Sequence, residues 1–177
     1  MIILLQVLPV ALRAMVPVTL CAVGEITGER AGVVNIGLEG IMTLSAFAAA
    51  IGSWATGNPW IGALCGMGAG AIVGLLHGFI SVYLRGDQII SGVGINLLGM
   101  GAVGFGTWAL WGAKSPMLDK KFWIPEVPGL GISPFVLMTP LLVVLTWWLL
   151  HRTALGLRIR AVGENPVAAD VVGVPVE

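Results

Sequence analysis

The sequence has few charged residues. Lys, Arg, Asp and Glu together make up 10% of its 177 residues, whereas a soluble domain carries about a quarter. A chain with this deficit lacks the polar side chains that cover a water-facing globule, which excludes a soluble fold. Its formal net charge is +0, so the charge balance gives no reason to expect a nucleic-acid partner.

Several chemical motifs are also missing. The two cysteines predict neither a disulfide scaffold nor a metal site. The phosphate-binding pattern GxxxxGK[ST] does not occur, so the chain carries no recognisable ATP-binding loop. His77 and His151 lie on separate segments and form no catalytic cluster with other residues. The first apolar segment lacks the basic start and small-residue cleavage site of a secretory signal.

Long apolar runs fill most of the chain. Hydrophobic residues make up 57%, the mean hydropathy is +0.97, and the 26 glycines favour close helix packing in lipid over a β-barrel. We therefore predict an all-α membrane protein, a polytopic helical bundle with about five transmembrane segments. These are Ile2–Val23, Ala31–Ala55, Trp60–Leu84, Gln88–Gly112 and Pro134–Leu150. Residues 1–150 form the membrane body, and residues 151–177 form a polar region.

The basic residues predict the orientation. Arg152, Arg158 and Arg160 follow the fifth segment directly, so this end is expected in the cytoplasm. Counting back places Gly24–Arg30 and Arg85–Asp87 in inner loops. The outer connections are then Thr56–Pro59 and Lys114–Ser133. The chain is therefore predicted to be a multi-pass membrane protein with its two ends on opposite sides of the membrane.

Glycine recurs every four residues in the third segment, at Gly62, Gly66, Gly70, Gly74 and Gly78. A helix turns once per 3.6 residues, so these positions form a nearly side-chain-free stripe that lets another backbone approach closely. Packing inside one subunit is favoured over a dimer interface.

Two polar residues fall in the second apolar run. Asn35 and Glu39 are four residues apart and would share a face of a continuous helix. Nearby glycines could instead break this segment into a re-entrant entrance followed by a span. A carboxylate at membrane depth normally faces a partner or a water-filled cavity. Glu39 and Asn35 therefore either line a translocation path or form a structural pair with Arg13, and we favour the structural role.

Three further polar residues are expected to support helices. Asp87 is placed to cap the fourth segment. His77 is predicted to hydrogen-bond between helices, and Asn96 either contacts a polar solute or bonds to a neighbouring backbone. The structural role is favoured for each.

The polar end contains the signals of one short helix. Asn165 is a suitable N-cap, Pro166 fits the first helical position, and Gly173 fits a C-terminal stop. Val167 and Val171 share a face of this helix. A short helix with an apolar face, held just off the membrane, suits docking into a groove on another protein.

Three motifs resemble one transporter family. GEITGERAGVVNIGLEGIMTLSAFAA, DQIISGVGINLLGMG and GLRIRAVGENPVAADVVGV occur in this order. They resemble the permease subunits of ABC importers, specifically the ribose and branched-chain amino-acid type family and its simple-sugar and nucleoside branch. The last motif resembles the family's cytoplasmic coupling loop. The matching coupling positions are Gly163, Glu164, Asn165, Pro166, Ala168, Ala169 and Gly173, with Val171 on the apolar face. The matching second-segment positions are Arg30, Gly32, Asn35, Gly37, Glu39 and Gly40.

The resemblance implies a function that needs partners. It implies that separate cytoplasmic ATPase subunits bind ATP and Mg and hydrolyse the ATP, with no cofactor in this chain. It also implies a location in a bacterial or archaeal inner or plasma membrane, a second permease subunit, surrounding membrane lipid, and an extracellular or lipid-anchored solute-binding protein. Nucleosides or simple sugars are the expected solutes. Permeases of this branch continue with several more spans, so the chain is expected to be an N-terminal fragment.

Two other classes compete with this interpretation. A secondary transporter or a channel component would need no ATPase, and its activity would depend on membrane potential or pH. A membrane-embedded enzyme is disfavoured because the sequence offers no cluster of nucleophile and base.

Overall fold

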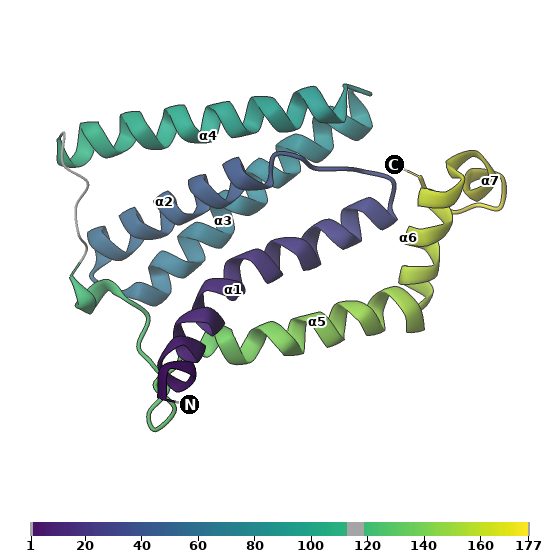
Figure 1. The fold of residues 1–177 in the computed structure, drawn as a ribbon. Coiled ribbons are helices and arrows are strands. Elements are labelled where there is room, and N and C mark those ends of the chain that lie inside the picture. Colours follow the sequence, from purple (N-terminus) through teal and green to yellow (C-terminus); the bar gives the residue numbers. More distant parts are fainter. Residues whose placement is uncertain (1, 113–118, 177) are drawn as a thin grey trace. The chain divides into compact units, whose positions relative to one another are not determined.

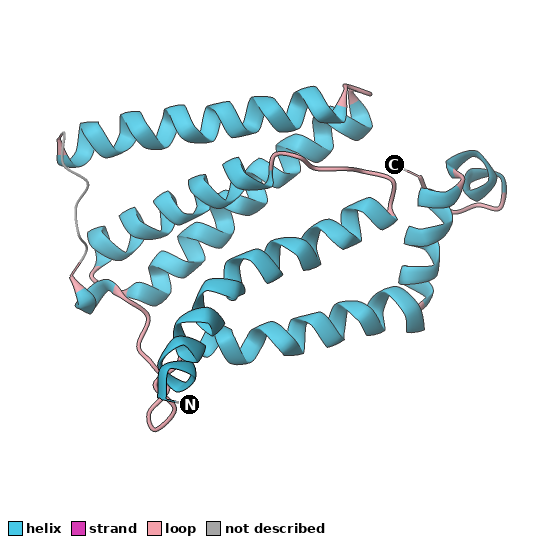
Figure 2. Ribbon diagram, in the orientation of Figure 1, coloured by secondary structure: helices cyan, strands magenta, loops and turns pink. Residues whose placement is uncertain are grey.

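A computed structural model describes residues 2–112 and 119–176, and these residues form helices and connecting turns without a strand (Figures 1 and 2). The elements are α1 (Ile2–Arg30), α2 (Leu38–Thr56), α3 (Pro59–Gly78), the π-helical turn η1 (Phe79–Tyr83), α4 (Gln88–Trp111), the 3₁₀ turn η2 (Lys120–Phe122), α5 (Pro134–Arg152), α6 (Ala154–Glu164) and α7 (Pro166–Val171). The predicted all-α fold is confirmed for this part of the chain.

Five helices are long and apolar enough to cross a membrane. The candidate spans are Val7–Arg30, Leu38–Thr56, Pro59–Tyr83, Gln88–Trp111 and Pro134–Arg152. Each is at least as long as the roughly 17 residues that a bilayer requires. Their large apolar side chains are mostly exposed, as expected for helices whose surroundings are lipid and other helices. The prediction of a polytopic helical protein with five spans is confirmed.

Two predicted boundaries are wrong. The segment Gly24–Arg30 was predicted as an inner loop, but α1 continues to Arg30. The second segment was predicted to begin at Ala31, but α2 begins at Leu38 and residues 31–37 are not helical. Gly32, with φ +88°, ends α1 because this backbone conformation is accessible to glycine and strained for other residues.

The chain folds as two units, one formed by residues 35–124 and the other by residues 1–34 with 125–177. In the first unit, α2 packs against α3 through the glycine stripe. A Cβ added at Gly66 would lie 2.9 Å from the Ser45 carbonyl oxygen, and one at Gly70 would lie 2.7 Å from Ser45 Oγ. No atom of the described residues comes within 4 Å of a Cβ added at Gly74 or Gly78. Packing inside the subunit is therefore confirmed for the start of the stripe.

α4 crosses α2 at an equally close contact. A Cβ added at Gly40 would lie 2.7 Å from the carbonyl carbon of Ile95, and one at Gly99 would lie 2.8 Å from the Gly40 Cα. The buried His77 hydrogen-bonds through Nδ1 to Ser91 Oγ on α4, at 3.1 Å. This bond confirms the predicted helix-to-helix role of His77.

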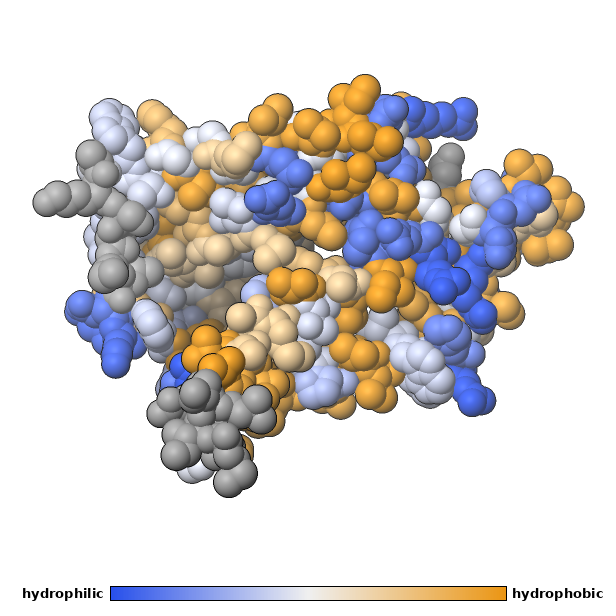
Figure 3. Space-filling view, viewed as in Figure 1, coloured by the Kyte–Doolittle hydropathy of each residue, from blue (hydrophilic) through white to orange (hydrophobic). Residues whose placement is uncertain are grey.

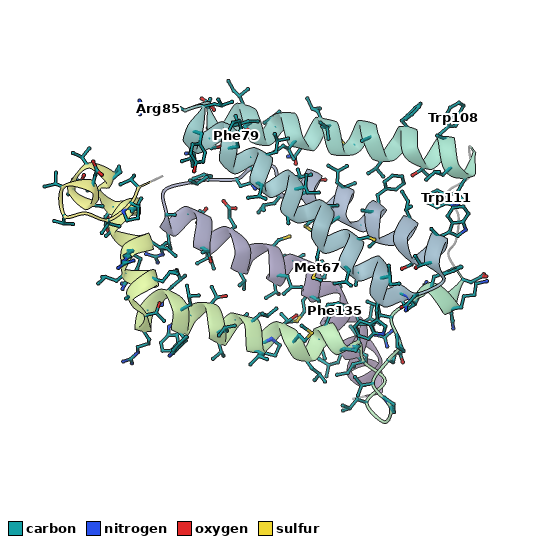
Figure 4. All side chains as sticks on the ribbon, turned by 180° about the vertical axis from the view of Figure 1, so that it is seen from behind. Met67, Phe79, Arg85, Trp108, Trp111 and Phe135 are labelled. Atoms are coloured by element: carbon teal, nitrogen blue, oxygen red, sulfur yellow. The ribbon has the colours of Figure 1, made fainter. Side chains whose placement is uncertain are left out.

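Aromatic residues gather at one end of this unit. Trp111 makes edge contacts with Trp54 and Phe47, with ring centroids 5.7 and 6.1 Å apart. Figure 4 shows Trp108 and Trp111 at one end of α4 and Arg85 at the other. The predicted inner and outer sides of these ends stay a prediction.

The second unit contains α1, α5, α6 and α7. α1 and α5 pack along each other, and α6 follows α5 after a sharp corner at Thr153 (Figure 1). Arg13 of α1 donates hydrogen bonds to Glu126 Oε1 at 2.6 Å and to the Gly131 carbonyl oxygen at 2.5 Å. This ion pair ties α1 to the segment that leads into α5.

Candidate functional site: a polar helix start and an exposed terminal helix

The polar residues at the start of α2 satisfy the backbone there. Asn35 lies in the non-helical segment, and its Oδ1 accepts a hydrogen bond from the Gly37 N–H at 2.8 Å. Asn96 of α4 accepts from the Gly40 N–H at 2.7 Å and donates to the Ile36 carbonyl oxygen at 3.1 Å. Of the two roles left open for Asn96, the structure thus gives it the bond to a neighbouring backbone.

Of the two arrangements left open for Asn35 and Glu39, the chain has the break and not the continuous helix. Asn35 precedes the helix and Glu39 lies in its first turn, so the two residues do not share a helical face. Arg13, the expected cation for a structural pair, is engaged by Glu126 and Gly131. Glu39 is exposed in the described chain. It lies in the first turn of α2, at the N-terminal end of the helix, where the helix dipole favours a negative charge.

Replacing Asn96 with leucine is expected to destabilise the purified protein in detergent. Leucine can neither accept from the Gly40 N–H nor donate to the Ile36 carbonyl, and each unpaired polar group in apolar surroundings costs about 1–3 kcal/mol. The melting temperature should fall clearly. Asn35→Ala removes the hydrogen bond from the Gly37 N–H but keeps both Asn96 bonds between α4 and the start of α2, so it should lower the melting temperature less. An Asn96→Leu protein as stable as the original would contradict the assigned hydrogen bonds.

The terminal helix α7 is formed as the sequence predicts. Asn165 is its N-cap and accepts a hydrogen bond from the Ala168 N–H at 3.0 Å, and Pro166 begins the helix. Gly173 follows the helix with φ +80°, a conformation that glycine adopts without strain. Asp87 caps α4 in the same way, accepting from the N–H groups of Ile89 and Ile90.

One face of α7 is apolar and exposed. Val167, Val171 and Val172 have exposed fractions of 74%, 82% and 75%, while Ala169 is buried against the rest of the unit. Figure 3 shows hydrophobic residues at the α7 tip beside hydrophilic ones over α6 and the end of α1. These valines form an exposed apolar face outside the five candidate spans, which makes it a candidate surface for another protein.

Helix α6 was missed in the sequence, where the polar end was interpreted as a single short helix. Thr153 caps α6 by accepting a hydrogen bond from the Gly156 N–H at 3.1 Å. The cap and the absence of proline up to Pro166 were available signals. The arginines of α6, Arg158 and Arg160, were interpreted as a topological marker and as residues that hold the connection at the lipid surface or pair with acidic residues of a partner.

The sequence was compared with known proteins. Residues 8–177 match the family described as branched-chain amino acid transport system / permease component. The chain belongs to this family. As a member of this permease family with five candidate spans, it is a multi-pass membrane protein.

Two curated relatives of this permease chain are named for nucleosides. The guanosine ABC transporter permease protein NupQ of Bacillus subtilis is 37% identical over 96% of the chain and 59% of its own length. The nucleoside ABC transporter permease protein NupC of Lactococcus lactis is 32% identical over 90% of the chain and 56% of its own length.

The fructose import permease protein FrcC of Rhizobium meliloti is 30% identical over 67% of the permease chain and 34% of its own length. The chain thus spans less than two thirds of the length of these three relatives. No solved structure matches it significantly.

Proposed function

We propose that the chain is part of the permease of an ATP-driven ABC importer for nucleosides or simple sugars. The observation that carries this proposal is the capped, solvent-exposed valine face of α7 in a chain of the permease family. Relatives named as ABC transporter permeases for guanosine and nucleosides support both the energy source and the solute class.

In this proposal, ATP and Mg are bound by separate cytoplasmic ATPase subunits, and α7 is the coupling helix seated in one of them. The residues that form the seat are Gly163, Glu164, Asn165, Pro166, Ala168, Ala169, Val171 and Gly173. The short helix presents an apolar surface on one side, and the acidic Glu164 and Asp170 lie close to that surface. This combination suits a groove on the partner with an apolar floor and a basic rim. Residues 151–177 are then the coupling region and residues 1–150 the membrane body.

The remaining partners are a second permease subunit, which completes the pathway, and a solute-binding protein on the outer side. The exposed Glu39 carboxylate at the start of α2 is assigned to the solute path or to a contact with the second subunit. Its position at the end of a candidate span supports this, because a carboxylate there needs water or a partner. The non-helical residues 31–37 with α2 form the proposed re-entrant entrance and span.

The solute class is tested by uptake into proteoliposomes that contain the assembled transporter and its binding protein. Tritiated guanosine should accumulate when ATP is enclosed on the side of the membrane that carries the ATPase subunits. Unlabelled nucleosides should compete with it better than fructose does. Stronger competition by fructose would move the assignment to sugars. Failure of both solutes to accumulate would contradict the proposal.

A further inference from the structure

A groove between the end of α1 and helix α6 is lined by charges of both signs. Its volume is about 410 Å³, within the range of about 300–1,000 Å³ that is usual for pockets that bind small molecules. The charged residues of its lining are Glu29, Arg30, Arg160 and Glu164. Both helices belong to one unit of the fold, and Figure 3 shows hydrophilic residues over this part of the surface.

The two sides of the groove are held in place by backbone contacts. A Cβ at Gly163 of α6 would lie 2.9 Å from the carbonyl carbon of Arg30, so the two helices touch beside the groove. Thr153 holds the start of α6 against α5, because its hydroxyl donates to the Leu149 carbonyl oxygen at 2.6 Å and accepts from the Gly156 N–H at 3.1 Å. The groove is therefore a fixed feature of this unit.

The four charged side chains of the groove do not neutralise one another. No ion pair joins any of them to another residue in the part of the chain that the structure describes. Glu29, Arg30 and Glu164 are exposed, and the half-buried Arg160 donates from Nε to the Gly156 carbonyl oxygen at 3.4 Å. This bond orients the guanidinium but does not neutralise its positive charge. The groove therefore offers two guanidinium groups and two carboxylates to one ligand.

The groove lies where two candidate spans end. The first span ends at Arg30 and the fifth ends at Arg152, and α6 follows the fifth span directly after the corner at Thr153 (Figure 1). Residues at the end of a span lie at the level of the lipid headgroups. Leu157, which lines the groove on α6, is 61% exposed, so the groove also presents apolar surface beside its charges.

A ligand that matches this lining carries a negative and a positive charge on one small group. A simple anion would meet the two carboxylates as well as the arginines, and a simple cation would meet the arginines. A phosphate ester joined to a primary amine satisfies both, because guanidinium groups donate in pairs to phosphate oxygens and an ammonium donates its N–H groups to carboxylates. At the surface of a bilayer, this chemistry is that of a phosphoethanolamine headgroup.

We propose that the groove binds the headgroup of a zwitterionic phospholipid with a primary amine, with Arg30 and Arg160 on the phosphate and Glu29 on the ammonium. Leu157 then lies against the apolar part of the lipid next to its headgroup. Binding at this site depends neither on the solute nor on the energy source of transport. Glu164 also belongs to the proposed seat for the ATPase, so it stays unchanged in the experiments.

The test is native mass spectrometry of the purified protein in micelles that contain equal amounts of three lipids. Phosphatidylethanolamine should be retained more than phosphatidylcholine, whose amine has no N–H, and more than the anionic phosphatidylglycerol. Replacing Arg30 and Arg160 together with glutamine should weaken retention of phosphatidylethanolamine by about tenfold. Arg158→Gln is the matched control and should leave retention unchanged, because Arg158 is an exposed arginine of α6 that does not line the groove.

Glu29→Gln separates the proposed site from a general attraction of arginines for phosphate. It should lower the preference for phosphatidylethanolamine over phosphatidylglycerol, because it removes a partner of the ammonium and a charge that repels the anionic lipid. Equal retention of the three lipids by the original protein would overturn the proposal, as would unchanged retention in the double arginine variant. Displacement of the lipid by soluble glycerophosphoethanolamine as readily as by added phosphatidylethanolamine would also overturn it and assign a soluble phosphate ester.

Thermal unfolding gives a second measurement of the same site. A ligand that binds only the folded protein raises its melting temperature. Phosphatidylethanolamine should therefore raise the melting temperature of the original and Arg158→Gln proteins but not that of the double arginine variant. An equal rise in all three proteins would place the lipid outside the groove. Weaker ATPase binding by the double variant, with the lipid-dependent rise unchanged, would assign the groove to the partner protein and overturn the lipid site.

Discussion

Val171→Asp is expected to weaken binding of the ATPase to the permease by about 30- to 100-fold. Val171 is 82% exposed, so aspartate at this position stays hydrated in the free chain. In the docked complex the aspartate would be buried in an apolar groove. The lost apolar contact and the buried charge together reduce the binding free energy by about 2–3 kcal/mol or more. Each 1.4 kcal/mol corresponds to about a tenfold change in Kd.

The binding is measured by titrating labelled ATPase subunit into the permease in nanodiscs. Leu130→Asp is the control, because Leu130 is also largely exposed, at 60%, but lies in the turn before α5 and away from α7. It should leave the Kd unchanged. Equal affinity of the Val171→Asp and original proteins, with α7 intact by its circular dichroism and thermal unfolding, would remove α7 from the docking surface.

Gly40→Ala is expected to cause a large loss of stability in the unit formed by residues 35–124. The added Cβ would meet the carbonyl carbon of Ile95 at 2.7 Å and the Cα of Asn96 at 2.8 Å. Helices α2 and α4 must then separate, which costs about 1–3 kcal/mol in packing. Separation also lengthens the 2.7 Å hydrogen bond from the Gly40 N–H to Asn96, which adds to the loss.

Thermal unfolding in detergent measures this effect, with Gly101→Ala as the matched control on α4. No atom of the described residues lies within 4 Å of a Cβ at Gly101, and alanine is favoured over glycine in a helix by about 1 kcal/mol. The control should therefore be as stable as the original or slightly more stable. If Gly40→Ala and Gly101→Ala unfold at the same temperature, the close crossing of α2 and α4 is incorrect.

The spans and α7 could be predicted because their signals are local. Apolar runs long enough for a bilayer need no knowledge of tertiary contacts, and the Asn165–Pro166 pair defines a helix start by itself. The extension of α1 was missed because Glu25 and Glu29 were interpreted as loop residues. Glutamate is well accommodated in a helix. The residue that ends α1 is Gly32, whose φ is +88°.

The polar residues were harder to predict because their partners are distant in the sequence. Arg13 pairs with a carboxylate 113 positions away, and only the packing of α1 with the segment before α5 brings the two together. Asn96 was predicted to bond to a neighbouring backbone or to a solute. Its partners are the donating Gly40 N–H, 56 positions away, and the accepting Ile36 carbonyl oxygen, 60 positions away. Sequence spacing alone left a continuous helix or a glycine break open for Asn35 and Glu39, and the break before Leu38 decides between them.

The most direct test of an ATP-driven permease is the energy source of solute uptake. Proteoliposomes containing the complete transporter, its ATPase and its binding protein are loaded with ATP or with a non-hydrolysable analogue, in the presence and absence of ionophores that abolish ion gradients. The account predicts uptake of guanosine with ATP regardless of the ionophores, and no uptake with the analogue. Uptake that persists with the analogue and stops with the ionophores would contradict it and identify a secondary transporter.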